Sequence, residues 1–91
     1  MLTREVTVKD PLGFHLRTAA GVVSIARAHA SQVQLTCTDC ANCPRANACS
    51  ILELITLGAS QGNTLLVAVD GPDEELVMSE IKEFFDGGGG I

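Results

Sequence analysis

Basic side chains are scarce in this chain of 91 residues. Six lysines and arginines stand against eleven aspartates and glutamates, which gives a formal net charge of −5. The few basic residues are also scattered along the sequence instead of forming a cluster. Proteins that bind nucleic acid neutralise phosphates with clustered positive charge, so this composition argues against nucleic acid as a partner.

Long apolar runs are missing as well. No apolar stretch approaches the roughly 20 residues that a helix needs to span a bilayer. Residues 1–5 lack the apolar core of a secretory signal peptide. We therefore expect a cytoplasmic protein without membrane insertion, in a compartment where thiols normally stay reduced or bind metal.

The length limits the domain organisation. A chain of 91 residues has room for one small core, and its 46% apolar content is typical of a folded domain. We expect a single domain over residues 1–86. The tail at 87–91 contains four consecutive glycines, and such low complexity predicts a flexible segment.

Hydrophobic periodicity predicts an alternation of strands and helices. Alternating or continuous apolar residues predict strands at 2–8, 32–37 and 64–69. Helical spacing predicts helices at about 16–28, 51–57 and 73–86. The expected buried stripe of the first helix is Leu16, Ala19, Ala20, Val23 and Ala26, and that of the last is Val77, Ile81, Phe84 and Phe85.

The stretch Gly-Phe-His-Leu-Arg-Thr-Ala-Ala, residues 13–20, joins the first strand to the first helix. A helix start leaves backbone N–H groups unpaired, and its dipole favours negative charge. His15 can carry a phosphoryl group on a ring nitrogen there, with Arg17 and backbone amides around the phosphate. Without further context, a lone histidine at this place is more often a cap or a surface residue.

This stretch resembles the phosphohistidine motif of the HPr family, Gly-[Leu/Ile]-His-x-Arg-Pro-Ala. HPr proteins are phosphocarriers of the bacterial phosphotransferase system. Further matching stretches extend the resemblance over residues 2 to about 86, and they lie at 5–8, 49–54, 57–62 and 71–74. The chain departs from the family at Thr18, where proline is usual, and in a cysteine-rich insertion at about 37–49.

The resemblance implies the fold. In the family a hairpin follows the second strand, and residues 45–49 would supply its short third strand. We therefore expect an α+β fold, an HPr-like open-faced sandwich of order β-α-β-β-α-β-α. Its four antiparallel strands would be covered on one face by three helices.

The resemblance also implies the function. Enzyme I would transfer a phosphoryl group to His15, and a IIA-type domain would accept it. The imidazole would act as nucleophile and then as leaving group, while Arg17 pairs with the phosphoryl oxygens. Such a protein is a monomeric relay instead of a free-standing enzyme, and phosphotransfer requires no cofactor. The sequence does not distinguish sugar transport from a purely regulatory pathway.

Two further roles follow from the family. An apolar docking patch around His15 would be formed by Leu16, Ala20, Ile51, Leu52 and Ile55. Ser50 resembles the regulatory serine that a kinase phosphorylates in Gram-positive members. Its alternative role is a helix N-cap, because Ser50 and Glu53 have the spacing of a capping box.

Four cysteines lie close together in the insertion: Cys37, Cys40, Cys43 and Cys49. In a cytoplasmic protein this spacing favours a metal site, with zinc or an Fe–S cluster as the candidates. A disulfide or redox switch and free thiols are the alternatives. A hairpin would separate Cys37 from Cys49 by about 16 Å, too far for one shared ion. His29 is expected on the first helix, exposed to solvent.

The cysteines define a second hypothesis for the function. The chain would then be a metal- or redox-responsive regulatory module built on the HPr fold, with the cysteine-rich loop as its sensor. Elemental analysis and an absorption spectrum of anaerobically purified protein would distinguish the two hypotheses.

Overall fold

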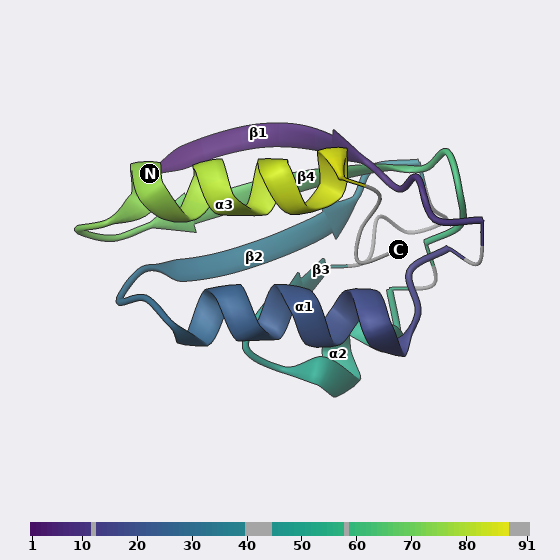
Figure 1. Cartoon of the computed structure of the whole chain (residues 1–91), viewed down its shortest axis with the longest axis horizontal. Coiled ribbons are helices and arrows are strands. Elements are labelled where there is room, and N and C mark those ends of the chain that lie inside the picture. Colours follow the sequence, from purple (N-terminus) through teal and green to yellow (C-terminus); the bar gives the residue numbers. More distant parts are fainter. Residues whose placement is uncertain (12, 40–44, 58, 88–91) are drawn as a thin grey trace.

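The computed structural model describes residues 1–11, 13–39, 45–57 and 59–87 (Figure 1). Its elements are β1 (Leu2–Thr7), α1 (Leu16–Arg27), β2 (Gln32–Cys37), β3 (Arg45–Asn47), α2 (Ile51–Ile55), β4 (Thr64–Asp70) and α3 (Glu74–Asp86). The predicted order β-α-β-β-α-β-α is confirmed. Within the described ranges, no helix is both long and apolar enough to cross a membrane.

The four strands form one antiparallel sheet in the order β1-β4-β2-β3. The apolar strand β4 lies in its interior, where both neighbours pair with it. Alternate residues of β4 are fully buried, namely Leu65, Val67 and Val69. The period of two therefore gives the sheet one apolar face, which the helices cover, and one more polar face, which they leave open (Figure 1).

The helices pack on this apolar face and on one another. Helix α3 lies against β1 and β4, and α1 contacts both α2 and α3. The prediction for α3 is confirmed at Val77, Ile81 and Phe85, which are buried. Phe84 is only half-buried, and Met78 is buried in addition, because the face that meets the sheet is turned slightly from the predicted stripe.

The predicted buried face of α1 was partly wrong. Ala19 and Ala26 are buried as expected, but Leu16 and Ala20 are exposed. Thr18 and Val22 are buried instead. The reason is that α1 contacts α2 and α3 at the same time. The buried face is therefore determined by tertiary packing, and not by the apolar residues of the helix alone.

Ser50 is the N-cap of α2, as its spacing predicted. Its hydroxyl oxygen accepts a hydrogen bond from the backbone N–H of Glu53. The carboxylate of Glu53 does not return to Ser50 but accepts from the backbone N–H of Asn47, the last residue of β3. The capping serine thus starts the helix, while Glu53 ties the helix to the third strand.

His29 does not lie on the first helix, and the prediction that it is solvated was wrong. It follows the C-cap Ala28, and its side chain is 16% exposed. Its ring lies between two carboxylates, 3.3 Å from Asp73 and 2.5 Å from Glu80. The start of α3 is thereby tied to the link between α1 and β2.

Asp73 takes part in a second set of contacts at this link. The hydroxyl of Ser31 and the backbone N–H of Ala30 donate to it, and these bonds hold the pKa of Asp73 below its ordinary value, although burial opposes them. Because its pKa is depressed on folding, Asp73 contributes stability above its unfolded pKa, and this contribution is lost as the pH falls.

Candidate functional site

A tight turn leads from β1 toward α1. The backbone N–H of Gly13 donates to the carbonyl oxygen of Asp10 at 2.8 Å, and this hydrogen bond closes the turn. Gly13 has a φ of +78°, a conformation that residues with a Cβ rarely adopt. A Cβ at this position would also lie 2.8 Å from the carbonyl oxygen of Ala59. Glycine is therefore required at this turn for two separate reasons.

His15 is the N-cap of α1. Its Nδ1 accepts a hydrogen bond from the backbone N–H of Arg17 at 3.2 Å. Its Nε2 lies 2.6 Å from Oδ2 of Asp10. Because Nδ1 accepts a hydrogen bond from the backbone N–H of Arg17 and Nε2 faces a carboxylate, the proton of the neutral ring belongs on Nε2. The lone pair of the ring is then on Nδ1, at the start of the helix.

The residue before His15 anchors it in the core. Phe14 is buried, its ring stacks on Phe85 with 6.2 Å between the centroids, and its backbone N–H donates to Ala59. The His15 side chain itself remains 28% exposed. The backbone is thus fixed while part of the imidazole reaches the surface.

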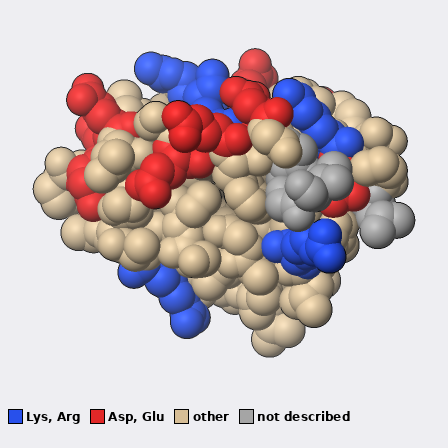
Figure 2. All heavy atoms as spheres, viewed as in Figure 1, with Lys and Arg blue, Asp and Glu red and all other residues tan. Residues whose placement is uncertain are grey.

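The electric field at this place favours an anion. Helix α1 has twelve residues and no acidic residue in its first turn, so no side chain of that turn compensates the positive end of its dipole. Arg17 lies in the same turn, with an exposed side chain. Much of the negative charge lies on α3, over which Figure 2 shows a band of acidic side chains. A phosphoryl group on Nδ1 would lie next to the backbone N–H of Arg17, at the positive end of the helix.

Replacing Gly13 by alanine is expected to destabilise the fold and to disturb this turn. The left-handed backbone alone costs about 1–2 kcal/mol for a residue with a Cβ. The contact with the Ala59 carbonyl adds to that cost. Gly62→Ala is the matched control, because Gly62 has a φ of +92° but no atom near its Cβ position. Urea unfolding should show a larger loss for Gly13→Ala; equal losses would contradict the close approach.

The residues of the predicted docking patch lie on α1 and α2, two helices in contact. Leu16 and Leu52 are 62% and 74% exposed, and Ile55 is 39% exposed. Ala20 is also exposed, whereas Ile51 is half-buried and packs against the core. Large apolar side chains with this exposure, beside a histidine at a helix start, are typical of a surface that binds another protein.

The cysteines are not all within the described residues, since Cys40 and Cys43 lie outside them. Cys37 is buried and takes part in a disulfide, while Cys49 is half-buried and carries a free thiol. In the part of the chain that the structure describes, no three side chains of His, Cys, Asp or Glu form a metal-binding group.

The hairpin of β2 and β3 determines how far apart two of these cysteines lie. Cys37 ends β2, whereas Cys49 follows Ala48, whose backbone N–H donates to Val33 near the other end of β2. The two cysteines are therefore about 16 Å apart along the hairpin. A metal site made by all four cysteines would require the hairpin to open and the disulfide of Cys37 to be reduced, and the sensor hypothesis stays a prediction.

Ser50 is half-buried, and its oxygen is engaged with the backbone of Glu53. Arg27 lies nearby and donates to the carbonyl oxygen of Cys49 at 3.1 Å. These contacts account for Ser50 as a structural cap. Its regulatory phosphorylation stays a prediction.

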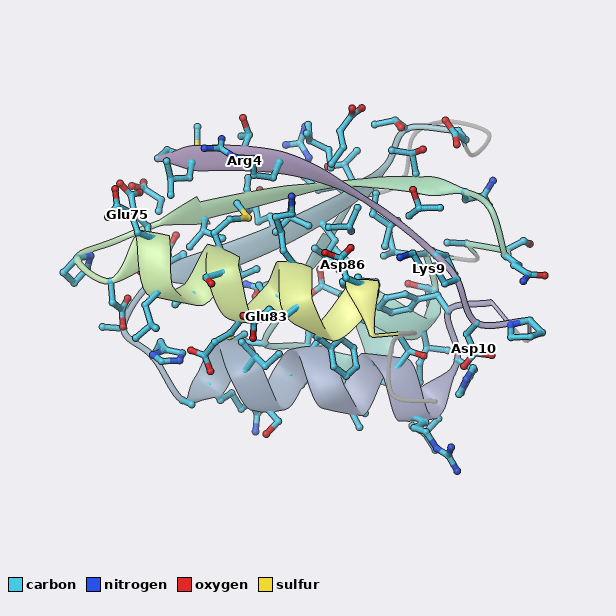
Figure 3. All side chains as sticks on the ribbon, turned by 45° about the horizontal axis from the view of Figure 1, so that its top comes forward. Arg4, Lys9, Asp10, Glu75, Glu83 and Asp86 are labelled. Carbon is cyan, nitrogen blue, oxygen red and sulfur yellow. The ribbon has the colours of Figure 1, made fainter. Side chains whose placement is uncertain are left out.

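Sequence reasoning missed one residue of the site. Asp10 was recognised only as part of a turn, yet its side chain lies against the ring of His15. Figure 3 shows Asp10 in the segment between β1 and α1. A signal was present, because a carboxylate at the first position of the turn that ends at Gly13 is carried close to the following helix start. The distance between the Asp10 carboxylate and the His15 ring depends on the conformation of the turn, which sequence patterns do not predict.

The fold and the site together define a class of protein, the open-faced α+β sandwiches that present a histidine ring nitrogen at the start of a helix. A family model described as "PTS HPr component phosphorylation site" matches residues 2–86. The chain belongs to the HPr phosphocarrier family of the phosphotransferase system.

Individual relatives agree with this assignment. The chain is 36% identical over 86 residues to the phosphocarrier protein HPr of Xylella fastidiosa, with 94% of this chain and 92% of that protein covered. It is 33% identical over 81 residues to HPr of Cupriavidus necator, with coverages of 89% and 86%. A crystal structure of HPr from Thermoanaerobacter tengcongensis superposes with a TM-score of 0.87 at 28% identity, covering 100% of this chain and 98% of that one.

Proposed function

We propose that this protein accepts a phosphoryl group on Nδ1 of His15 from enzyme I and passes it to a IIA-type domain. The proposal is supported above all by one observation: Nδ1 faces the backbone N–H of Arg17 at the start of α1, while Nε2 faces Asp10. Membership of the HPr family supports the same partners. We place this relay in the cytoplasm and assign it no cofactor.

The transfer step is a simple displacement. The lone pair of Nδ1 forms a bond to phosphorus, and the bond between phosphorus and the donor's leaving atom breaks, with the electron pair staying on that atom. Backbone N–H groups and Arg17 balance the charge of the phosphoryl oxygens. In the second transfer, Nδ1 is the leaving atom and recovers its lone pair. Nothing is consumed at the site, which suits a carrier.

The test is to incubate the protein with enzyme I and phosphoenolpyruvate carrying a labelled phosphoryl group. We expect label on the protein that is lost in acid and retained in alkali, as for a phosphoramidate. An authentic HPr in a parallel reaction confirms that the enzyme I preparation works. If that HPr is labelled and this protein is not, the proposed function is wrong.

Replacing Leu52 by aspartate is expected to weaken docking and leave the fold intact. Leu52 is 74% exposed, so its loss removes little buried area. A loss of about 1.4 kcal/mol in partner binding would raise the KM for enzyme I roughly tenfold. The measurement is steady-state phosphorylation at varied protein concentration, with Leu76→Asp as the control because Leu76 is 55% exposed on α3. An unchanged KM for Leu52→Asp would contradict the docking patch.

A further inference from the structure

Asp10 is the residue of the site to which neither the family motif nor the sequence assigns a role. The backbone of Asp10 is held in place, since its carbonyl oxygen accepts the hydrogen bond that closes the turn with Gly13. The side chain is only 8% exposed, although a carboxylate ordinarily prefers water. A buried carboxylate in this position needs a partner that compensates for its lost hydration. The ring of His15, at 2.6 Å, is such a partner.

We propose that Asp10 is a positioning residue for phosphoryl transfer, which orients the imidazole of His15 and balances the charge that the ring acquires. The inference rests on the proposed function of His15. Asp10 acts through Nε2 and does not touch the phosphoryl group. Each ring nitrogen has its own neighbour, because the backbone N–H of Arg17 faces Nδ1 and the carboxylate of Asp10 faces Nε2.

The charge balance of the step explains why a carboxylate is useful there. Before transfer the neutral ring carries its proton on Nε2, where it is donated to Asp10. As Nδ1 bonds to phosphorus, the ring still holds that proton and becomes positively charged. A carboxylate at Nε2 stabilises this charge, in the same way that a buried aspartate stabilises the imidazolium of a catalytic histidine. The interaction is strong because both groups are partly removed from water.

The same argument applies to the release of the phosphoryl group. A protonated ring is the better leaving group, because Nδ1 then departs as part of a neutral imidazole. By keeping the proton on Nε2, Asp10 favours the breaking of the P–N bond as well as its formation. Asp10 therefore acts on the rate of transfer in both directions and not on the docking of either partner.

The experiment compares Asp10→Asn and Asp10→Ala with the wild type in enzyme I-dependent phosphorylation. Asparagine keeps an acceptor at Nε2 but removes the charge, whereas alanine removes both. We expect kcat to fall about ten- to a hundredfold, the range for a hydrogen bond to a charged partner, with KM unchanged and the alanine variant slower. Asp70→Asn is the matched control, since Asp70 is exposed at the end of β4 and its replacement changes the net charge equally. Thermal unfolding verifies that each variant is folded.

A second measurement detects the hydrogen bond between His15 and Asp10 directly and does not require phosphoryl transfer. In protein labelled with ¹⁵N-histidine, the Nε2-bound proton of His15 should give a slowly exchanging downfield proton signal, and Asp10→Ala should abolish it. Absence of this signal in the wild type would overturn the inference. So would folded Asp10 variants that transfer at the wild-type rate, or variants whose loss lies entirely in KM.

The outcomes separate this inference from the proposed function. If the wild type is phosphorylated and the Asp10 variants match it, the positioning role fails while the phosphocarrier function stands. If the wild type accepts no phosphoryl group, the proposed function fails and the positioning role falls with it. The downfield signal still decides in that case whether Asp10 and His15 are paired.

Discussion

Replacing His15 by alanine is expected to leave a folded protein that no longer accepts a phosphoryl group. The described residues offer no second imidazole at a helix start, because His29 is held between Asp73 and Glu80 near the other end of α1. Loss of the ring removes the nucleophile, so we expect the rate to fall at least about a thousandfold, or about 4 kcal/mol in barrier height. Acid-labile labelling from phosphoenolpyruvate and enzyme I is the measurement.

The controls for this variant are available within the chain. His15 also caps α1, and loss of such a cap costs about 1 kcal/mol, which a folded domain normally tolerates. Circular dichroism should therefore show native secondary structure for His15→Ala. His29→Gln should keep its label, since that residue is not at the site. Label retained by His15→Ala would refute His15 as the acceptor.

Replacing Phe85 by alanine is expected to produce the largest loss of stability. Its side chain is 1% exposed, stacks on Phe14 and meets Phe84 edge-on. Truncation of a buried phenylalanine to alanine costs about 3–5 kcal/mol, from lost transfer energy and the cavity that remains. That is a large part of the roughly 5–15 kcal/mol that stabilises a small domain. Urea unfolding monitored by circular dichroism measures the change.

The matched control is Leu76→Ala on the same helix. Leu76 is 55% exposed, so its truncation should change the free energy of unfolding by less than about 0.5 kcal/mol. Similar losses for the two variants would mean that Phe85 does not anchor the core as described. Because Phe14 precedes His15, a destabilised Phe85→Ala protein should also transfer phosphoryl groups more slowly near its unfolding midpoint.

Local pattern was sufficient for much of the fold. Alternation in β2 predicted that Val33, Leu35 and Cys37 share a buried face, and all three are buried. The continuous apolar run of β4 predicted an interior strand, and β4 lies between β1 and β2. These predictions succeed because a strand's side chains alternate with a period that the sequence alone encodes. The resemblance to the HPr family added the short third strand.

Packing between elements decided what the pattern left open. Leu16 and Ala20 fit the apolar stripe of α1 but are exposed, since α2 and α3 select the buried face. His29 was expected in solvent, but α3 and its N-cap pack against it, so its ring lies between the carboxylates of Asp73 and Glu80. Both errors concern residues whose neighbours are distant in the sequence. Periodicity describes one element at a time and cannot place a second element against it.

The site shows the same division. The sequence by itself determined that His15 stands at a helix start with Arg17 in the first turn, because the strand, turn and helix signals are all local. Only the tertiary structure decided that Asp10 faces Nε2 and that the backbone N–H of Arg17 faces Nδ1. The physical reason is that a hydrogen bond forms only when the distance between donor and acceptor is correct to within a few tenths of an ångström. Such distances follow from the closed turn at Gly13 and from the packing of Phe14 against Phe85, which exist only in the folded chain.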